Sequence, residues 1–475
     1  MEEKKITSRE EDFSQWYLDV IRVAELVEHG PVRGTMIIRP YGYAIWENIQ
    51  KEFDKRIKAT GVENAYFPLF IPNEFLHREA KHVEGFSPEV VVVTHAGGEE
   101  LKEPFVVRPT SETIMYDAYS RWVESYKNLP ILINQWANVV RWEVRPRLFL
   151  RSTEFLWQEG HTAHATPEEA DERAQQMLGE YKKFAEEFLA IPIFSGKKTD
   201  SERFAGADIT YTTEAMMQDG KALQFATSHN LGDKFAKAFN IKFVDENGDI
   251  KYCYQTSWGM STRTLGGLIM VHSDDSGLIV PPNVAPYEVV IIPVWPKPED
   301  REMVDKEVEK LKETLEKDFR VKVDDTDLRV GEKFYKWEKK GTPLRLEIGP
   351  RDIQEGHVVL ARRDTGEKIT VKMEDLTKEI KRLLEDIQKN LFDIAKKRMD
   401  ENTVRVESYD EFKKAIENKK FVLGYWAGSS DDEAKLKEET MATVRCFPFE
   451  HEGEKGKCFY TGKKDAKLAL LARSY

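Results

Sequence analysis

The chain has 475 residues, of which 40% are hydrophobic and 33% are charged. This composition excludes a disordered or fibrous protein, and the length predicts roughly two to four domains. The net charge of −12 argues against general binding of polyanions, although a local basic surface can still contact phosphate groups. Only three cysteines occur, which predicts a reducing compartment and therefore a cytoplasmic location. No apolar run is long enough to span a bilayer, so no membrane partner is expected.

Up to about Gly277, the sequence predicts strands in succession with helices inserted between them. Apolar positions at helical spacing and capping residues predict helices over 13–28 and about 43–58, from 109–112 onward, and from 166 to about 190. Apolar runs predict strands over 65–72, 90–95 and 131–144 and near 207–213, 222–228, 251–257 and 266–271. This order is typical of an α+β fold with a mostly antiparallel sheet.

A proline-rich segment, 278–290, marks a boundary, after which strands and helices alternate up to residue 399. This alternation predicts a compact α/β domain of roughly one hundred residues. A third, small α+β domain starts near residue 403, with a capping box at Ser408 and Glu411 and a strand over 421–428. We therefore expect domains over 1–282, 283–400 and 401–475.

The stretch 141–161 alternates charged and aromatic side chains. Read as a hairpin, it places Arg141 and Glu143 on one face. On the returning strand, the residues that share a face are Phe155, Trp157, Glu159 and His161. Charges interleaved with an apolar wall are costly to bury, so this face suits a pocket for a charged ligand. A surface hairpin with paired salt bridges is the alternative.

Three further clusters are candidates for a binding site. The segment 108–112 combines charge and hydroxyl groups at a strand–helix junction, where a simple N-cap is the alternative. The segment 224–230 carries polar groups at alternate positions, where a structural core histidine is the alternative. The segment 256–263 combines small residues with Arg263 at a helix start, which allows a ligand to approach the backbone closely.

Two arginines, Arg141 and Arg263, would suit a phosphate clamp around a nucleotide. The chain has neither a P-loop nor a GxGxxG motif, so the common nucleotide-binding folds are not indicated. His161 and His164 form an H-x-x-H pair. No third ligand follows at a suitable spacing, so we do not predict a metal site there.

On these residues the chain resembles the class II aminoacyl-tRNA synthetases, and within that class the prolyl-tRNA synthetases of the archaeal/eukaryotic-like architecture. The likeness covers nearly the whole length. The segment 41–68 is similar to motif 1, which builds the dimer interface of that family. The residues at 141–143 are similar to motif 2, those at 259–263 to motif 3, and those at 109–112 to the proline-recognition loop. The resemblance implies a class II antiparallel-sheet catalytic domain, an α/β anticodon-binding domain, a small C-terminal domain and a homodimer.

The resemblance also implies that the chain activates L-proline with ATP, with Mg²⁺ on the phosphates, and transfers it to tRNA(Pro). Arg141 and Arg263 would be the catalytic residues, with Arg141 contacting both substrates. The residues implied for ATP are Arg141, Glu143, Arg151, Gln224, Thr227 and Arg263. Those implied for proline are Thr110, Glu112, Arg141, Trp157, Glu159, His161, Phe204, His229 and Ser257.

Two more sets of residues come from the resemblance. The carboxylate of the terminal Tyr475 would lie near the active site and help to order it. Splayed anticodon bases would be read by polar side chains of the second domain, and our candidates are Arg345, Glu347, Asp352 and Lys368. Each of these four could equally be a solvated surface charge.

The chain departs from its relatives in two places. Arg141 and Arg263 are too close in sequence to leave room for the editing domain that bacterial-type relatives carry between motifs 2 and 3, so we expect no editing in cis. Relatives often bind a structural zinc through four cysteines, and the matching positions here are Ala427, Asp432, Cys458 and Thr461. One thiolate cannot supply that site, so we expect no zinc.

Two other interpretations remain open. The first is a synthetase for threonine, histidine or glycine, against which the proline-recognition loop and the set Trp157, Glu159 and His161 argue. The second is a catalytically inactive paralogue that acts as an RNA-binding or regulatory partner. The presence of Arg141, Glu143 and Arg263 argues against it.

Overall fold

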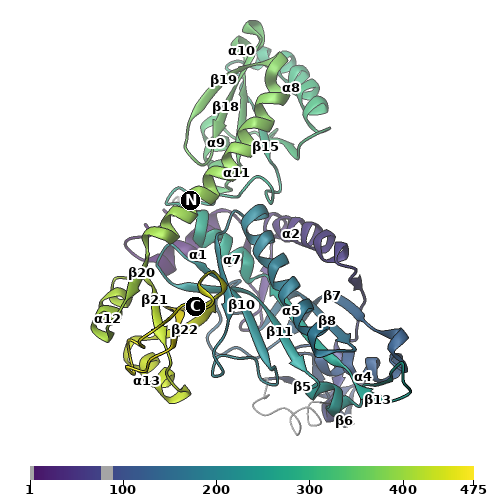
Figure 1. Cartoon of the computed structure of the whole chain (residues 1–475). Coiled ribbons are helices and arrows are strands. Elements are labelled where there is room, and N and C mark those ends of the chain that lie inside the picture. Colours follow the sequence, from purple (N-terminus) through teal and green to yellow (C-terminus); the bar gives the residue numbers. More distant parts are fainter. Residues whose placement is uncertain (1–4, 76–88) are drawn as a thin grey trace.

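The computed structural model describes residues 5–75 and 89–475. Its largest sheet is mostly antiparallel and runs through the body of the molecule (Figure 1), which confirms the predicted α+β class. A second sheet, with helices around it, stands apart from this body at the top of Figure 1.

The first part of the chain supplies the centre of the large sheet and the helices around it. Its helices are α1 (Phe13–Val23), α2 (Pro40–Ala59), α4 (Glu112–Trp122), α5 (Pro167–Lys183), α6 (Lys234–Phe239) and α7 (Arg263–His272), with short helical turns at Tyr126–Asn128 and Phe184–Phe188. Its strands are β1 (Val27–His29), β2 (Met36–Ile38), β3 (Glu63–Asn64), β4 (Phe70–Pro72), β5 (Val91–Ala96), β6 (Glu99–Val107), β7 (Ile131–Val140), β8 (Glu154–His164), β9 (Ile193–Lys197), β10 (Ile209–Met216), β11 (Ala222–Gly232), β12 (Lys242–Val244), β13 (Ile250–Tyr252) and β14 (Tyr254–Ser261).

The middle unit, as we call the elements from β15 to α11, is the part that stands apart. Its strands are β15 (Val289–Pro293), β16 (Val321–Val323), β17 (Leu344–Ile348), β18 (His357–Arg362) and β19 (Lys368–Lys372). Its helices are α8 (Arg301–Leu315), α9 (Val330–Lys339), α10 (Pro350–Glu355) and α11 (Leu376–Glu401), with short turns at Pro298–Asp300 and Met373–Asp375. The strand order is β16-β15-β17-β18-β19, parallel in the first three strands and antiparallel in the rest.

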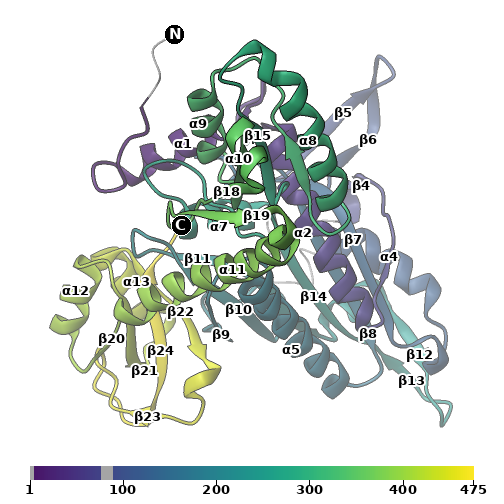
Figure 2. The ribbon, with the colours of Figure 1, turned by 90° about the horizontal axis from the view of Figure 1, so that it is seen from above.

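The C-terminal unit comprises the elements from β20 to β24, and the long helix α11 leads into it (Figures 1 and 2). Its strands are β20 (Thr403–Val406), β21 (Phe421–Trp426), β22 (Ala442–Pro448), β23 (Lys455–Gly456) and β24 (Ala466–Arg473). Its helices are α12 (Tyr409–Glu417) and α13 (Ser430–Thr440), with a short turn at Phe449–His451. The predicted cap is present, since the Ser408 side chain accepts a hydrogen bond from the Glu411 amide (3.3 Å).

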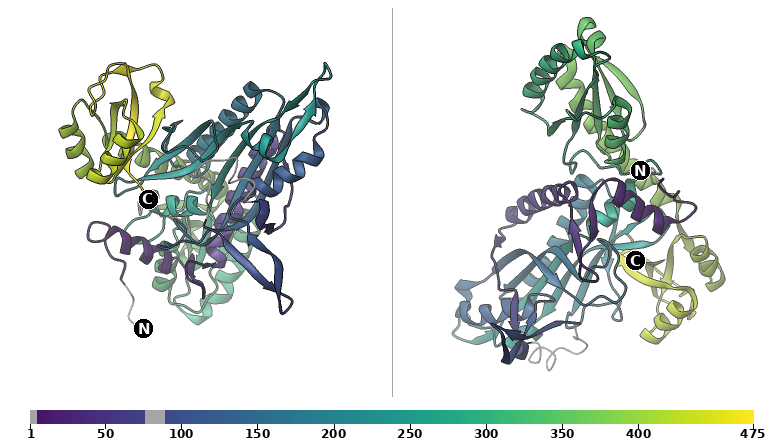
Figure 3. Two further views of the ribbon diagram at one scale, coloured as in Figure 1. Left: turned by 90° about the horizontal axis from the view of Figure 1, so that it is seen from below. Right: turned by 180° about the vertical axis from the view of Figure 1, so that it is seen from behind.

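The C-terminal unit continues the large sheet rather than forming a sheet of its own. The strands follow the order β20-β21-β24-β22-β9-β10-β11-β14-β8-β7-β3, with β23 beside β24. The join is the antiparallel pairing of β22 with β9, in which Phe447 faces Lys197 and Pro448 faces Gly196. Figures 2 and 3 show the C-terminal unit at the β9 edge of the large sheet.

Helix α5 covers one face of the central strands and anchors the core. It begins where the sequence predicts, because the Thr166 side chain accepts a hydrogen bond from the Glu169 amide (3.2 Å). Its buried side chains face the sheet and α2, and the ring of Tyr181 stacks on Phe53 at 4.9 Å. A helix that packs one apolar stripe on a sheet leaves the other sheet face available for a ligand.

Three predicted elements differ from the structure. The first helix ends at Val23 instead of reaching residue 28, because Glu25 takes a left-handed φ of 57° and the chain turns into β1. Strand β7 ends at Val140, so Arg141 and Glu143 belong to a connection and not to the strand. The segment 266–271 is part of α7 and not a strand, since a short, wholly apolar run has no periodicity that separates the two.

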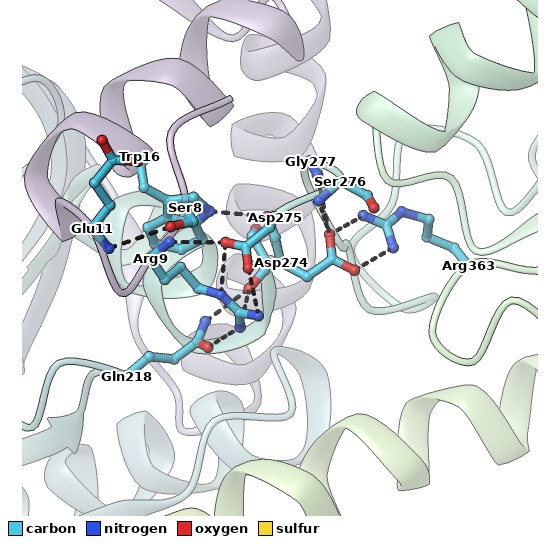
Figure 4. A network of polar contacts seen from close by, with 11 residues as sticks. Ser8, Arg9, Glu11, Trp16, Gln218, Asp274, Asp275, Ser276, Gly277 and Arg363 are labelled. Carbon is cyan, nitrogen blue, oxygen red and sulfur yellow. Dashed lines mark hydrogen bonds and ion pairs between the residues drawn. The ribbon is translucent and has the colours of Figure 1, made fainter. Parts of the chain in front are cut away.

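A polar junction joins the middle unit to the body of the molecule (Figure 4). Arg363, next to the end of β18, donates two hydrogen bonds to the Asp274 carboxylate at 2.6 and 2.8 Å. Asp274 lies two residues after the end of α7. On the other side of the same loop, Arg9 pairs with Asp275 at 3.1 Å and donates to Gln218 at 2.6 Å. The loop after α7 is therefore held by ion pairs from both sides.

Among the described residues, no helix combines the length and the apolar character needed to cross a membrane.

Candidate active site

A cavity of about 310 Å³ opens on the face of the large sheet opposite α5. Thr227 and His229 line it, whereas Ser228 between them donates a hydrogen bond to the Ala174 carbonyl in α5 (2.7 Å). Successive side chains of a strand point to opposite faces. The polar side chains predicted at alternate positions of the segment 224–230 thus line a cavity.

The cavity brings together most of the residues that the sequence singled out. The predicted residues that line it are Thr110, Glu112, Arg141, Trp157, Glu159, His161, Phe204, Gln224, Thr227, His229, Ser257 and Arg263. The strand register explains why distant clusters meet, because His229 faces Ser257 across β11 and β14, and Ser257 faces His161 across β14 and β8. Phe155 also lines the cavity, so the predicted face of β8 is present with all four of its members.

Two residues predicted for ATP do not line the cavity. The Glu143 carboxylate accepts a hydrogen bond from the Arg145 amide (2.9 Å) within the connection between β7 and β8. Arg151, near the end of the same connection, pairs its backbone with Arg147. Arg151 is nevertheless close enough to Arg263 for its charge to act on that residue.

Glu159 and His161 form a buried, fully paired unit on β8. The Glu159 carboxylate accepts hydrogen bonds from the Ser111 amide (3.2 Å), the Ser111 hydroxyl, Gln135 (3.1 Å) and His161 Nε2 (3.0 Å). Burial alone would raise the pKa of Glu159, but these hydrogen bonds outweigh it and lower the pKa below its ordinary value. Burial alone would lower the pKa of His161, but Glu159 and Glu112 outweigh it and raise that pKa.

Glu112 and Arg141 both line the cavity, and each is held by a hydrogen bond to the segment 109–110. Glu112 is the first residue of α4 and accepts a hydrogen bond from the Thr110 hydroxyl. Arg141 Nε donates to the Pro109 carbonyl (2.8 Å), and its guanidinium lies 5.3 Å from the Trp157 ring centre. Burial lowers the pKa of Arg141, and the carboxylates of Glu112 and Glu159 oppose this shift. The guanidinium is thus close to the rings of Phe155 and Trp157 and within reach of the charges of two carboxylates.

Arg263 begins α7 and is fixed by Nε, which donates to the Leu150 carbonyl (3.1 Å). Burial is the largest cause that lowers the pKa of Arg263, to about 10, followed by the charges of Arg151 and Arg141, with Glu214 opposing. Several cations that repel one another without enough carboxylates to balance them favour a bound anion.

His229 and Phe204 build another part of the wall. Their rings lie 4.7 Å apart, and Thr210 holds both through His229 Nδ1 (3.0 Å) and the Phe204 amide (2.9 Å). Burial, followed by the charges of Lys198 and His161, lowers the pKa of His229 to about 3. His229 is therefore neutral at physiological pH and presents a polar but uncharged group.

Three buried polar atoms of cavity-lining residues have no hydrogen-bond partner among the described residues. They are the Ser257 hydroxyl, Trp157 Nε1 and Trp258 Nε1. A buried donor without a partner costs about 1–3 kcal/mol, so such groups in a cavity wall are suited to a polar ligand.

Sequence reasoning missed the cavity residues Lys198, Glu202 and Thr210. Lys198 and Glu202 lie in the connection after β9, a strand that the sequence did not predict. Nothing local distinguishes them from the other charged residues nearby, because their position depends on the pairing of β9 with β10 and β22.

No group of three or more histidine, cysteine, aspartate or glutamate side chains is arranged to hold a metal ion in the described parts of the chain. At the positions that hold zinc in relatives, the amides of Ala427 and Thr461 donate to Cys458 Sγ at 3.3 and 3.4 Å. Asp432 instead accepts hydrogen bonds from Ser429 at the start of α13. These residues do not fit a four-ligand zinc site.

The terminal Tyr475 does not line the main cavity. Its amide donates to the Ala222 carbonyl (3.1 Å) at the start of β11, and its hydroxyl donates to Asp219 (2.7 Å). Tyr475 and Leu150 line a smaller cavity of about 200 Å³. Leu150 also accepts the Arg263 hydrogen bond, so this residue borders both the Tyr475 cavity and that arginine.

Three of the four predicted anticodon residues meet on the middle sheet. Arg345 on β17 and Lys368 on β19 both donate to Glu347 (3.0 and 2.9 Å). Both cations also lie over the Phe334 ring, at 4.3 and 5.2 Å from its centre. Asp352 lies elsewhere, where it accepts a hydrogen bond from the Gly349 amide (2.7 Å) at the start of α10.

Comparison with known families agrees with this arrangement. A model of the class II tRNA synthetase core domain (G, H, P, S and T) matches residues 93–272. A model of the anticodon binding domain matches residues 288–383, and one of the prolyl-tRNA synthetase C-terminal domain matches residues 409–475. The three matches follow one another along the chain in the order of the three parts of the structure.

Whole-length relatives carry the same designation. The chloroplastic/mitochondrial proline–tRNA ligase of Arabidopsis thaliana is 52% identical over 100% of this chain and 89% of its own length. The proline–tRNA ligases of Chlorobium phaeovibrioides and Lachnoclostridium phytofermentans are 51% and 53% identical over 99% of this chain, and over 99% and 98% of their own lengths. The chain therefore belongs to the proline–tRNA ligase family of class II aminoacyl-tRNA synthetases.

Proposed function

We propose that the cavity is the site where the chain activates L-proline with ATP before transferring it to tRNA(Pro). One observation carries this proposal: a single cavity is lined both by carboxylates, Glu112 and Glu159, and by two arginines, Arg141 and Arg263. Arg141 is close enough for its charge to act with those of Glu112 and Glu159 and also with that of Arg263. Such a cavity is complementary to an amino acid whose ammonium and carboxylate point in opposite directions, with a triphosphate beyond the carboxylate.

The proline end supplies an anion and flat walls. We assign Glu112 to the secondary ammonium, with Thr110 orienting its carboxylate. Trp157 and Phe204 enclose the ring, with His229, Ser257 and the Glu159–His161 pair behind it. Aromatic faces attract a cation as well as apolar groups, so they suit a cyclic secondary amine.

The nucleotide end supplies positive charge. We assign Arg141 to the α-phosphate and to the prolyl carboxylate, Arg263 to the γ-phosphate, and Gln224 and Thr227 to the ribose and adenosine. Glu143 and Arg151 lie in the connection outside the cavity, so their proposed contact with ATP requires that connection to close over the nucleotide. We assign Tyr475 an indirect supporting role at this end, because it lines a small cavity together with Leu150, which accepts the hydrogen bond from Arg263.

The chemistry needs positioning more than proton transfer. A carboxylate oxygen of proline attacks the α-phosphorus, the bond to the bridging oxygen breaks, and pyrophosphate leaves with its electron pair. Arg141 and Arg263 hold the reactants in line and neutralise the charge that develops on the phosphates. Mg²⁺ would add further neutralisation, held mainly by the phosphates and water, which fits a cavity with few carboxylates at this end.

The remaining assignments follow the same proposal. We assign residues 1–282 to catalysis, 283–400 to the anticodon and 401–475 to a C-terminal domain without zinc, and we place the enzyme in the cytoplasm. Arg345, Glu347 and Lys368 form one cluster able to contact bases, whereas Asp352 would act separately. Stoichiometric zinc by elemental analysis, or hydrolysis of alanyl-tRNA(Pro) by the purified protein, would contradict the proposed absence of zinc and of editing.

A homodimer is also part of the proposal. Tyr43, at the start of α2, is an exposed apolar side chain in the region that resembles motif 1, and Ile37 on β2, just before that region, is exposed as well. Exposed apolar residues on neighbouring elements suit a contact with a second copy. A monomeric mass in sedimentation equilibrium would contradict it.

Amino-acid-dependent exchange of pyrophosphate into ATP tests the function. We expect exchange with proline and none with threonine, histidine or glycine. Replacing Arg141 with alanine should abolish exchange while the circular dichroism spectrum stays unchanged, because the side chain contacts both substrates. Arg145→Ala, in the same connection but outside the cavity, is the matched control and should retain activity. Near-normal exchange by the Arg141 variant would contradict its assignment.

A further inference from the structure

Lys198 is a cavity residue with unused hydrogen-bonding capacity. Its side chain is 4% exposed and lines the cavity. The ammonium lies 3.6 Å from the Glu214 carboxylate, and it makes no hydrogen bond to any residue that the structure describes. An ammonium has three donors and is strongly hydrated in water, so a buried ammonium with one ion pair at 3.6 Å still has donors that a ligand's acceptors can satisfy.

The neighbouring carboxylate is already occupied by another cation. Glu214, on β10, is fully buried, and Arg445 of β22 donates to both of its oxygens at 3.0–3.2 Å. The Thr212 hydroxyl donates to the same carboxylate (2.9 Å). Lys198, Arg445 and Glu214 together carry one excess positive charge, which the carboxylate of Glu202 partly offsets through its action on Arg445. Of these residues, Lys198 and Glu202 line the cavity.

The register of the sheet places the backbone of Lys198 beside Thr210, which faces His229, while its ammonium reaches Glu214 on the side of the nucleotide end. Thr212 faces Thr227 and Glu214 faces Gln224 across β10 and β11, and these partners are the proposed ribose and adenosine contacts. The backbone of Lys198 is tied to β10 through its amide, which donates to the Thr210 carbonyl (2.9 Å). The ammonium thus lies along the wall that leads from His229 toward Gln224.

The C-terminal unit holds this wall from outside. Besides Arg445, the Glu433 carboxylate of α13 accepts hydrogen bonds from the hydroxyls of Thr199 (3.0 Å) and Ser201 in the segment after β9. The pairing of β22 with β9 ends at Lys197, next to Lys198. Three separate contacts therefore fix the short segment that carries this lysine.

We propose that Lys198 is a further ligand of the nucleotide and that its ammonium binds an anionic phosphate oxygen. Glu214, which is held by Arg445, positions the ammonium of Lys198. Arg445 is in this sense a positioning residue, through which the C-terminal unit completes the activation site. This inference rests on the proposed function of the cavity. Other sources of an anionic oxygen are the proline carboxylate and the phosphate of the last nucleotide of tRNA. The KM values for ATP, proline and tRNA distinguish these sources.

The test compares the full-length enzyme with Lys198→Met in pyrophosphate exchange. A charge-assisted hydrogen bond contributes enough that we expect the KM for ATP to rise roughly ten- to a hundredfold. The KM for proline and the KM for tRNA in aminoacylation should stay within about twofold, the usual range for changes without direct contact. Lys198→Arg should recover part of the affinity. Lys197→Met is the matched control, since Lys197 is exposed and lies over the Tyr211 ring, so its kinetics should match the wild type.

Arg445→Met should raise the KM for ATP by a smaller factor, because Lys198 remains but is no longer held. In the Lys198→Met background the same change should add nothing further, which a merely structural role would not produce.

An unchanged KM for ATP in Lys198→Met, a rise in the KM for proline or tRNA instead, or a full Arg445 effect without Lys198 would each overturn the inference. If wild type and Lys197→Met exchange with proline, the proposed function stands even where the inference fails. Matching melting temperatures of Lys198→Met and the wild type exclude misfolding as the cause.

Discussion

Glu159 is the residue whose chemistry depends most on its neighbours. Four donors converge on its buried carboxylate: an amide, a hydroxyl, a side-chain amide and an imidazole. A carboxylate offers acceptors only, so every partner is satisfied while the group stays ionised. The hydrogen bond to His161 raises the pKa of that imidazole and so favours its charged form. This arrangement of charges is lost if Glu159 is replaced by a group that itself donates hydrogen bonds.

Glu159→Gln should therefore weaken proline binding without removing side-chain volume. The new amide group would point a donor at other donors, and each unsatisfied buried group costs about 1–3 kcal/mol. We expect the KM for proline to rise at least tenfold, since about 1.4 kcal/mol corresponds to a factor of ten. The pKa of His161 should fall as well, because the opposing charge of Glu159 is gone. Exchange kinetics and imidazole NMR titration measure these two effects.

Glu154→Gln is the control for this change. Glu154 begins the same strand, is exposed, and accepts one hydrogen bond from Asn138 (2.8 Å). The same chemical change there should leave the KM for proline unaltered. Equal effects of the two variants would show that the Glu159 network does not shape the pocket.

At the scale of elements, β8 carries two functional side chains that are separated in the sequence by one glycine. Gly160 lies between Glu159 and His161 and faces Trp258 of β14. A Cβ at position 160 would lie 2.1 Å from two atoms of the Trp258 ring. The ring is buried and packed, so it cannot move aside without disturbing the sheet. The close approach of β8 and β14 at this point depends on the missing side chain.

Gly160→Ala is expected to destabilise the protein and to disturb the pocket together. Overpacking in a core costs about 1–3 kcal/mol, and the displaced backbone carries Glu159 and His161 with it. Chemical denaturation should show the loss of stability, and exchange kinetics should show a raised KM for proline. Gly179→Ala in α5 is the matched control, because a Cβ there meets nothing within 4 Å. That change should stabilise the helix by about 0.5–1 kcal/mol. Unchanged stability and an unchanged KM for proline in Gly160→Ala would show that the Trp258 ring can move aside.

The elements also show what the sequence can and cannot predict. The alternation on β8 is local, so the shared face of Phe155, Trp157, Glu159 and His161 could be predicted, and it is confirmed. Arg141 was predicted in the strand, but β7 ends one residue earlier, where the Arg141 amide turns to the Thr153 carbonyl (2.8 Å). Lys198 could not be predicted, because its place depends on the pairing of β9 with strands far along the chain. Local patterns thus predict faces, whereas contacts between distant strands decide which residues share a cavity.

At the scale of the whole molecule, the middle unit touches the body near the end of α7. This helix begins at Arg263 in the cavity and ends at His272, two residues before Asp274. Asp274 accepts the bidentate pair from Arg363 and also hydrogen bonds from the amides of Ser276 (2.9 Å) and Gly277 (3.1 Å) (Figure 4). A single helix therefore connects the proposed phosphate site with the unit proposed to bind the anticodon.

Arg363→Met tests whether this junction sets the distance between the two units. A tRNA must reach both the cavity and the middle unit, whereas pyrophosphate exchange needs the cavity alone. Removing a bidentate, largely buried pair should loosen the docking by about 1–2 kcal/mol, which predicts a roughly five- to thirtyfold rise in the KM for tRNA. Exchange should be unchanged, because Asp274 retains its two amide donors and the loop after α7 keeps its shape. Arg382→Met is the control, since Arg382 is exposed on α11 and pairs only with Glu379 among the described residues. Equal losses in exchange and aminoacylation would instead show that the pair supports α7 itself.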